Sequence, residues 1–181
     1  MKRLVLIALV ALFCFQVQAQ RYLTKNGMIS LYSKTPFETV EAQNNQVNCA
    51  LDAKTSDFVF KVLMKSFEFK RALMQEHFNE NYVESDKFPN AMFKGKVTNL
   101  KTIDFNKDGV YPAEVEGDLT MHGISKHINA KGSFEIKDGK VTGKCHFTIK
   151  VEDYGIKVPS AVTDKIAESI QIDVNVMMAA M

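Results

Sequence analysis

Several residue types and features are scarce in this sequence of 181 residues. It contains no tryptophan, four prolines and three cysteines. Its longest apolar run is shorter than the roughly 20 residues that cross a bilayer as a helix. Charge of one sign is not in excess either, because 23 basic and 21 acidic residues give a formal net charge of +2. This balance argues against nucleic acid or an anionic membrane as the main partner. We therefore expect no nucleic-acid binding and no stable membrane span.

Motifs for catalysis and metal binding are also missing. The sequence has no HExxH pair, nucleophile elbow, P-loop or dinucleotide glycine pattern. His122 and His127 flank a predicted turn, and His146 falls on an outward strand face with Lys144 and Thr148, where histidine is usually solvated. The sequence therefore indicates neither an enzyme nor a metal site.

The first 19 residues are typical of a cleavable signal peptide. Lys2 and Arg3 begin it, an apolar run of about a dozen residues follows, and a small-residue cleavage site ends at Ala19. We expect cleavage after Ala19 and a location outside the cytoplasm, in the periplasm. A lipoprotein site at Cys14 is less favoured, because the bulky Phe13 precedes it.

The mature chain is expected to be one domain over residues 20–181. Removing the signal peptide removes two basic residues and no acids, so 23 − 2 = 21 basic residues balance 21 acidic ones. The remaining length is typical of a single compact domain with a sizeable core, and no repeat or linker interrupts it.

Strict alternation of apolar and polar residues makes residues 112–136 a predicted β-hairpin, with its connection at residues 122–126. Three small residues, Gly117, Ala130 and Gly132, fall within the apolar rows, where they favour bending, a close approach or room inside a curved sheet. A curved antiparallel sheet with small inward residues indicates a barrel.

Most of the remaining sequence also has strand character. Short strands are expected between residues 28 and 52, separated by turns at residues 25–27 and 43–45. Eight or nine antiparallel strands in one domain predict a mainly all-β fold, and their hairpin succession favours a single antiparallel β-barrel over a sandwich. Further strands are expected over residues 56–66, 91–100, 141–151 and 169–178.

Helix is expected in two places. Residues 69–82 have helical spacing, with Leu73 and His77 on the inward stripe, and form the main helix. A short helical turn is predicted around Val162 and Ile166, with Ser160 as its cap.

Cys49 and Cys145 each lie on the apolar row of a predicted strand. Their spacing matches no zinc, haem or redox pattern, so two small buried hydrophobic side chains are the favoured interpretation. A disulfide between them stays open, because the sequence does not give the separation of their Cα atoms.

Four segments together resemble the YceI-like family of exported bacterial proteins. They are ALMQEHF, FPNAMFKGKV, EGDLTMHGISKHI and VEDYGIKVP, and the resemblance extends over residues 22–178. It implies a lipocalin-like, eight-stranded antiparallel barrel that holds a polyisoprenoid or isoprenoid quinone chain in its lumen. The chain departs from the family at its start, where RYLTKNG lacks the usual tryptophan and aspartate–proline pair, and before His77, where Gln75 and Glu76 replace arginine and aspartate.

The candidate ligand-binding residues lie on the predicted inward rows. Each has a second interpretation as plain core, because every small barrel fills its interior with such side chains. His77 is a candidate hydrogen-bond partner for a ligand head group at the barrel mouth, or else a core histidine bonded to the backbone. The apolar candidates are Phe58, Phe60, Val62, Met64, Phe93, Val97, Leu119, Phe134, Phe147 and Ile149.

The sequence thus predicts an exported, non-enzymatic protein that holds a long isoprenoid-like lipid chain as a carrier or buffer. No cofactor is expected, and the polyisoprenoid or quinone lipid is the ligand itself. The alternative is a solid-core barrel that acts in a stress response or binds another protein. Ligand chain length, head group and oligomeric state, a homodimer included, stay open.

Overall fold

A computed structural model describes residues 21–159 and 166–181 of the chain. The predicted signal peptide, Ser160 and Val162 lie outside the described residues, whereas Ile166, the other residue of the predicted helical turn, lies in a bend and not in a helix. Removal of residues 1–19 and a single domain over residues 20–181 therefore stay predictions.

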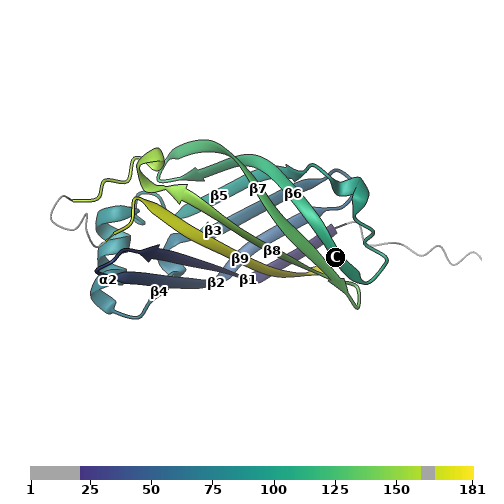
Figure 1. Cartoon of the computed structure of the whole chain (residues 1–181), viewed down its shortest axis with the longest axis horizontal. Helices are drawn as coiled ribbons and strands as arrows, with labels where there is room; N and C mark the ends of the chain where they lie inside the picture. Colours follow the sequence, from purple (N-terminus) through teal and green to yellow (C-terminus); the bar gives the residue numbers. More distant parts are fainter. Residues whose placement is uncertain (1–20, 160–165) are drawn as a thin grey trace, which may run out of the picture.

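One closed antiparallel barrel accounts for the described strands (Figure 1). The hydrogen-bonded order is β1-β9-β8-β7-β6-β5-β3-β2, and β2 pairs again with β1, so eight strands close into a ring. A ninth strand, β4, adds two residues to β2. The predicted fold class is confirmed. The strands are β1 (Arg21–Lys34), β2 (Thr39–Asp52), β3 (Asp57–Leu63), β4 (Glu68–Phe69), β5 (Asn90–Val97), β6 (Gly109–Met121), β7 (Ile124–Lys137), β8 (Lys140–Lys150) and β9 (Ser169–Ala180).

Glycines let neighbouring strands approach closely where the barrel wall bends. Gly95 of β5 pairs with Gly117 of β6, and a Cβ atom on Gly117 would lie 2.4 Å from the Gly95 Cα atom. A Cβ on Gly132 would likewise lie 2.2 Å from the Lys144 carbonyl oxygen on β8. Bending, close approach and interior room were the interpretations left open for Gly117, Ala130 and Gly132, and for Gly117 the close approach applies. Gly132 and Ala130 additionally line the lumen cavity.

The two turns predicted near the start of the chain are wrong, because β1 and β2 run straight through them. Ile29 pairs with Asn44 and Gly27 with Val47, so β2 has three steps where β1 has two. The buried Asn44 stabilises this bulge, since its amide nitrogen donates to the Leu63 carbonyl at 2.9 Å. Glycine and asparagine occur in bulges as well as in turns. Here β1 and β2 stay paired on either side of these residues, so they form bulges.

The β6–β7 and β7–β8 hairpins each have a two-residue turn. β6 and β7 join through His122 and Gly123, whose φ angles are 51° and 77°, and Met121 pairs with Ile124. The connection is therefore shorter than the five residues predicted. β7 and β8 join through Asp138 and Gly139, with φ angles of 50° and 72°. Both are type I′ turns, whose twist matches the strands they connect.

The main helix is shorter than predicted, and its inward face differs. α2 spans Ala72–His77 and continues as one π-helical turn, η2 (Phe78–Tyr82), while Phe69 belongs to β4. Leu73 is 61% exposed instead of inward. A six-residue helix lying on the barrel end turns only a few side chains inward. The inward stripe that was predicted over residues 69–82 is therefore not formed. Short 3₁₀ turns are η1 (Met64–Ser66), η3 (Leu100–Thr102) and η4 (Val151–Tyr154), and no described helix is long and apolar enough to span a membrane.

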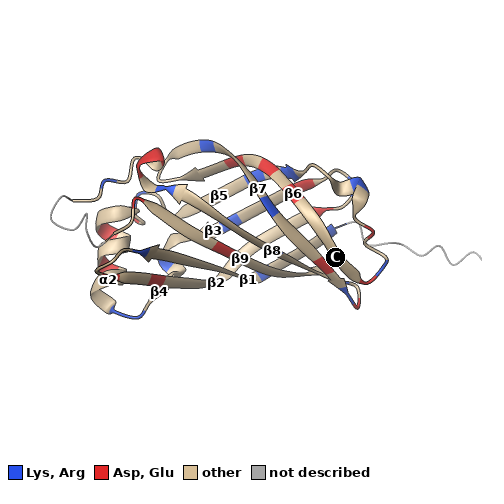
Figure 2. Cartoon of the chain, viewed as in Figure 1, with Lys and Arg blue, Asp and Glu red and all other residues tan. Residues whose placement is uncertain are grey.

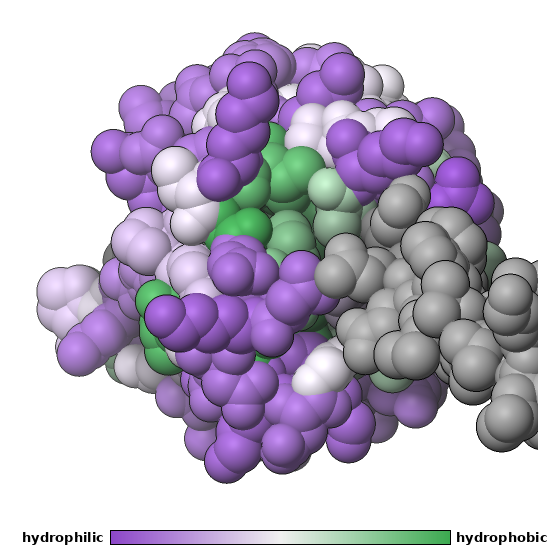
Figure 3. Space-filling model, turned by 90° about the vertical axis from the view of Figure 1, so that its right-hand side faces the viewer, coloured by the Kyte–Doolittle hydropathy of each residue, from purple (hydrophilic) through white to green (hydrophobic). Residues whose placement is uncertain are grey.

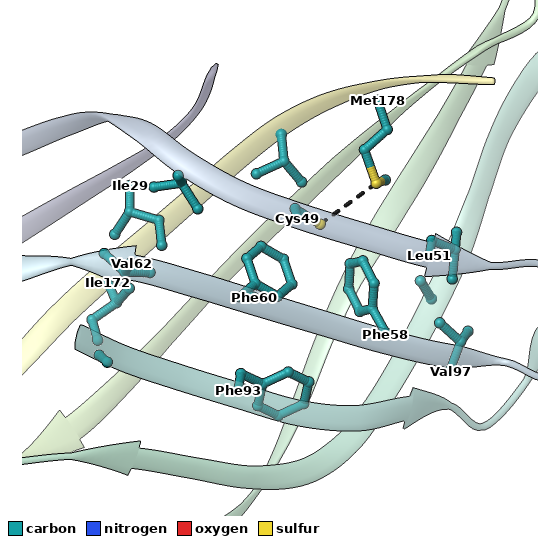
Figure 4. Close-up of a cluster of buried hydrophobic side chains, with 14 of the residues drawn as sticks. Ile29, Cys49, Leu51, Phe58, Phe60, Val62, Phe93, Val97, Ile172 and Met178 are labelled. Carbon is teal, nitrogen blue, oxygen red and sulfur yellow. Dashed lines mark hydrogen bonds between the residues drawn. The ribbon is translucent and has the colours of Figure 1, made fainter. Parts of the chain in front are cut away.

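Aromatic rings form the centre of the core (Figure 4). Phe58 contacts Phe60 and Phe134 edge-on, with ring centroids 4.8 and 5.6 Å apart. Phe60 in turn meets Phe93 of β5 at 6.2 Å. Basic and acidic residues are interspersed over the strands (Figure 2), and Lys144 of β8 forms a 2.9 Å ion pair with Glu135 of the neighbouring β7.

Replacing Gly117 with alanine should destabilise the barrel. The new Cβ would overlap the backbone of β5, so we expect the free energy of unfolding to fall by about 1–3 kcal/mol, as for other overpacked sites. Urea unfolding followed by circular dichroism measures this. Gly139→Asn is the control, because nothing lies within 4 Å of a Cβ there and asparagine tolerates positive φ. Equal losses in the two variants would contradict the close-approach explanation.

Candidate functional site

The interior of the barrel contains an apolar cavity of about 100 Å³, here called the lumen cavity. The inward rows of β3, β5, β6, β7, β8 and β9 and one residue of β1 surround it. Seven of the ten predicted apolar candidates line it: Phe58, Phe60, Val62, Phe93, Leu119, Phe134 and Phe147.

The other three apolar candidates lie in the core but not on the cavity. Met64, Val97 and Ile149 are 4%, 1% and 8% exposed, and they pack against neighbouring side chains instead. Several cavity residues were not predicted, although the same alternating rows contain them. These are mainly the smaller residues Ile29, Ala91, Ala113, Val115, Ala130, Val174 and Val176.

A second cavity of about 200 Å³, the mouth chamber, lies at the α2 end of the barrel. It follows the lumen cavity along the barrel, since Ile29 of β1 lines the lumen and Leu31, two residues on, lines the mouth. Met74, His77 and Phe78 contribute to it from α2 and η2. Of the two positions left open for His77, the structure has the barrel mouth, on a largely solvent-facing helix, and not the core.

Polar groups are few in the mouth chamber. Ser33, Glu38, His77 and Tyr82 supply them, and Glu38 is the one charged side chain among the described lining residues, histidine aside. The Glu38 carboxylate contacts the Arg71 guanidinium, which joins the β1–β2 turn to the start of α2. Burial raises the pKa of Tyr82 above its ordinary value. The chamber is thus apolar with a small polar lip.

His122 is not the solvated turn residue that the sequence predicted. Its side chain is only 13% exposed, and its Nδ1–H donates to the Tyr154 carbonyl oxygen at 2.9 Å. Its Nε2 lies 2.7 Å from a carboxylate oxygen of Glu84, and Phe88 packs edge-on against the ring. Strand alternation alone did not reveal this, because all three contacts come from distant segments. Val83, beside Glu84, lines the mouth chamber, so His122 fixes part of the chamber wall.

The two remaining strand histidines conform to the prediction. His127 contacts Asp118 and His146 contacts Asp173, and both histidine side chains are 58% exposed. Within residues 21–159 and 166–181, no three histidine, cysteine or acidic side chains gather as metal ligands would.

Cys49 and Cys145 are free thiols. Cys49 is buried, with its Sγ 3.5 Å from the Met178 sulfur (Figure 4), whereas the partly buried Cys145 lines the lumen cavity. Burial raises the pKa of both thiols, and the nearby Asp173 carboxylate adds to the effect at Cys145.

The opposite end of the barrel presents a different surface. Figure 3 looks onto this end, where apolar side chains lie in a hollow framed by hydrophilic residues. Tyr22 and Phe105 stack with ring centroids 5.5 Å apart. Apolar side chains thus gather at both ends of the barrel, in the mouth chamber beneath α2 and in the hollow at the opposite end.

A closed antiparallel barrel of eight strands with an apolar lumen and a helix at its mouth is a lipocalin-like barrel. Comparison with known families makes the assignment specific. The YceI-like domain model matches residues 24–178, and the chain belongs to the YceI-like family.

Curated relatives cover only part of the sequence. A UPF0312 protein of Pseudomonas putida F1 is 32% identical over 102 residues, which is 53% of this chain and 47% of the relative. A UPF0312 protein of Pseudomonas fluorescens is 36% identical over 62 residues, or 34% of this chain and 30% of the relative. The matched region therefore spans about half or less of these relatives.

Solved structures share the fold at low sequence identity. A polyisoprenoid binding domain from Saccharophagus degradans, implicated in plant cell wall breakdown, is 11% identical with a TM-score of 0.78, covering 90% of this chain and 99% of that domain. BcnA of Burkholderia cenocepacia is 14% identical with a TM-score of 0.69, covering 85% and 96%. The YCEI protein of Campylobacter jejuni is 17% identical with a TM-score of 0.54, covering 73% and 78%.

The first prediction from the site concerns His122. His122→Ala removes a buried hydrogen bond and the Glu84 contact, so we expect the free energy of unfolding to fall by about 1–3 kcal/mol. The matched control is His127→Ala, which removes an exposed histidine–carboxylate contact and should cost about 1 kcal/mol or less. Urea unfolding of both variants distinguishes them. Similar small losses of unfolding free energy in both variants would show that His122 stabilises the fold no more than an exposed histidine does.

The second prediction concerns the thiols. Because burial raises the pKa of both, little reactive thiolate is present at neutral pH. We expect iodoacetamide to modify Cys49 and Cys145 at least about tenfold more slowly in the folded protein than in urea, as mass spectrometry of the peptides can measure. Rapid modification in the folded state, or recovery of a Cys49–Cys145 disulfide from protein purified without reductant, would contradict this.

Proposed function

We propose that this protein is an exported, periplasmic carrier or buffer that holds an isoprenoid-like lipid chain in its barrel. The observation that carries the proposal is the pair of successive apolar cavities, one in the lumen and one at the mouth. Further support comes from the signal-like sequence of residues 1–19 and from the polyisoprenoid binding named for the Saccharophagus domain. Holding a lipid chain involves no chemical step, so the proposed role is non-enzymatic.

Apolar contact alone can supply the affinity. Each buried methylene contributes about 0.8 kcal/mol, so about ten buried carbons give a gross term near 8 kcal/mol, on the scale of micromolar affinity before ordering costs. The chain would extend from the lumen cavity toward the mouth chamber, and His77 would lie beside its head group. A polyisoprenoid or a quinone satisfies this description.

The size of the lumen cavity favours a second candidate function. A volume of about 100 Å³ is several times the roughly 10–15 Å³ that a cavity needs to hold one water molecule, whereas a long chain needs more. Phe58, Phe60 and Phe93 occupy the centre and would have to rotate aside for a long ligand. If they do not, the barrel has a solid core, and a role in protein interaction or stress protection fits better.

The decisive experiment is identification of the natural ligand. Protein purified from its own host is analysed by native mass spectrometry and by lipid extraction. We expect a mass increment that disappears on extraction and a recovered prenyl lipid. Repeated recovery of empty protein that takes up neither quinones nor prenols would refute lipid binding and leave the solid-core alternative.

Filling the lumen should weaken binding. Ala130→Leu places extra atoms in the lumen cavity, so we expect at least about tenfold weaker prenol binding in equilibrium dialysis. Asn129→Leu, on the exposed face of the same strand, adds an apolar side chain outside and should leave binding unchanged. Circular dichroism melting establishes that both variants are folded. Unchanged affinity in folded Ala130→Leu would show that the lipid does not bind in the lumen cavity.

A further inference from the structure

We infer that the mouth chamber selects a neutral polar head group and rejects a diphosphate, with the Glu38 carboxylate as the specificity-determining group. The inference rests on the proposed function and specifies the chemical class of the ligand. Prenols and quinols are neutral lipids of this kind, and prenyl diphosphates have the same chain with a highly charged end.

The polar groups of the chamber suit a neutral oxygen. Ser33, Glu38, His77 and Tyr82 line it, together with apolar side chains of β1, β2, β9, α2 and η2, and none of its described lining residues is lysine or arginine. A hydroxyl head group can donate to the Glu38 carboxylate, which makes a charge-assisted hydrogen bond. A diphosphate would lose its hydration in an apolar chamber and find no lysine or arginine among the described lining residues to replace it.

The two basic side chains before α2 are already bound to acids. Arg71 contacts the Glu38 carboxylate itself. Lys70, its neighbour in the sequence, lies 2.7 Å from Glu41, which belongs to a separate surface groove. Glu38 therefore holds Arg71, so this guanidinium is not free to bind an anion in the chamber.

The position of Glu38 is fixed by the turn before β2. The Thr35 hydroxyl oxygen accepts from the backbone N–H of Glu38 at 3.1 Å, and the Thr35 N–H donates to the Glu38 carbonyl at 2.9 Å. The carboxylate is 24% exposed, so it meets the chamber and is partly shielded from bulk water. In this position the second carboxylate oxygen can accept a hydrogen bond from a ligand hydroxyl, while the contact with Arg71 keeps the guanidinium from an incoming anion.

The test compares two probes that differ only in the head group, geranylgeraniol and geranylgeranyl diphosphate. Equilibrium dialysis with mass-spectrometric quantification gives the ratio of their affinities for the full chain. We expect the wild-type protein to favour the alcohol by at least about tenfold. Glu38→Gln removes the negative charge and releases Arg71, so the ratio should shift toward the diphosphate by about tenfold. Glu41→Gln is the matched control, because it removes an acid paired with a base outside the chamber, and it should leave the ratio unchanged.

Each outcome separates this inference from the proposed function. If wild type binds the diphosphate as tightly as the alcohol, or if Glu38→Gln leaves the ratio unchanged, head-group selection by Glu38 is wrong while lipid binding stands. If Glu41→Gln shifts the ratio as much as Glu38→Gln, general surface charge is responsible and the inference fails. If neither probe binds the folded wild type, the proposed function fails, and the inference fails with it.

Discussion

Closure of the sheet on itself is the constraint on which the rest of this structure depends. β1 pairs with β2 on one side and with β9 on the other, so the eight-stranded wall has no free edge within the described residues. A closed wall of eight strands leaves an interior only wide enough for side chains or one slender ligand. Wall curvature in turn demands close strand contacts, which the facing glycines Gly95 and Gly117 permit.

The narrow interior explains the contrast between the two cavities. In the middle of the barrel, inward aromatic rings meet across the lumen and leave about 100 Å³. At the α2 end the strands separate, a short helix and turns replace the wall, and about 200 Å³ remains with polar groups at its lip. Non-repetitive segments can place a carboxylate or an imidazole at a cavity, whereas a regular strand row of this kind presents mainly apolar groups. Chemical selectivity is therefore expected at the mouth and apolar affinity in the lumen.

Much of this arrangement could be predicted from the sequence, since alternation depends only on local geometry. Successive strand residues point to opposite faces, so the apolar rows of β3 and β5 to β9 identified the interior before their neighbours were known. The errors share a cause. The bulge at Asn44, the short α2 and the buried His122 each depend on partners far away in the sequence, such as Leu63 and Tyr154.

The sequence by itself determined the fold class, the family segments and most of the side chains that face the lumen, because hydrophobic periodicity and short turns act over a few residues. Only the tertiary structure decided how much space those side chains leave, which of them reach a cavity, and which polar groups meet at its mouth. Packing of rings such as Phe58, Phe60 and Phe134 depends on strands brought together by closure. The contact between Glu38 and Arg71 likewise depends on where two separate chain segments meet.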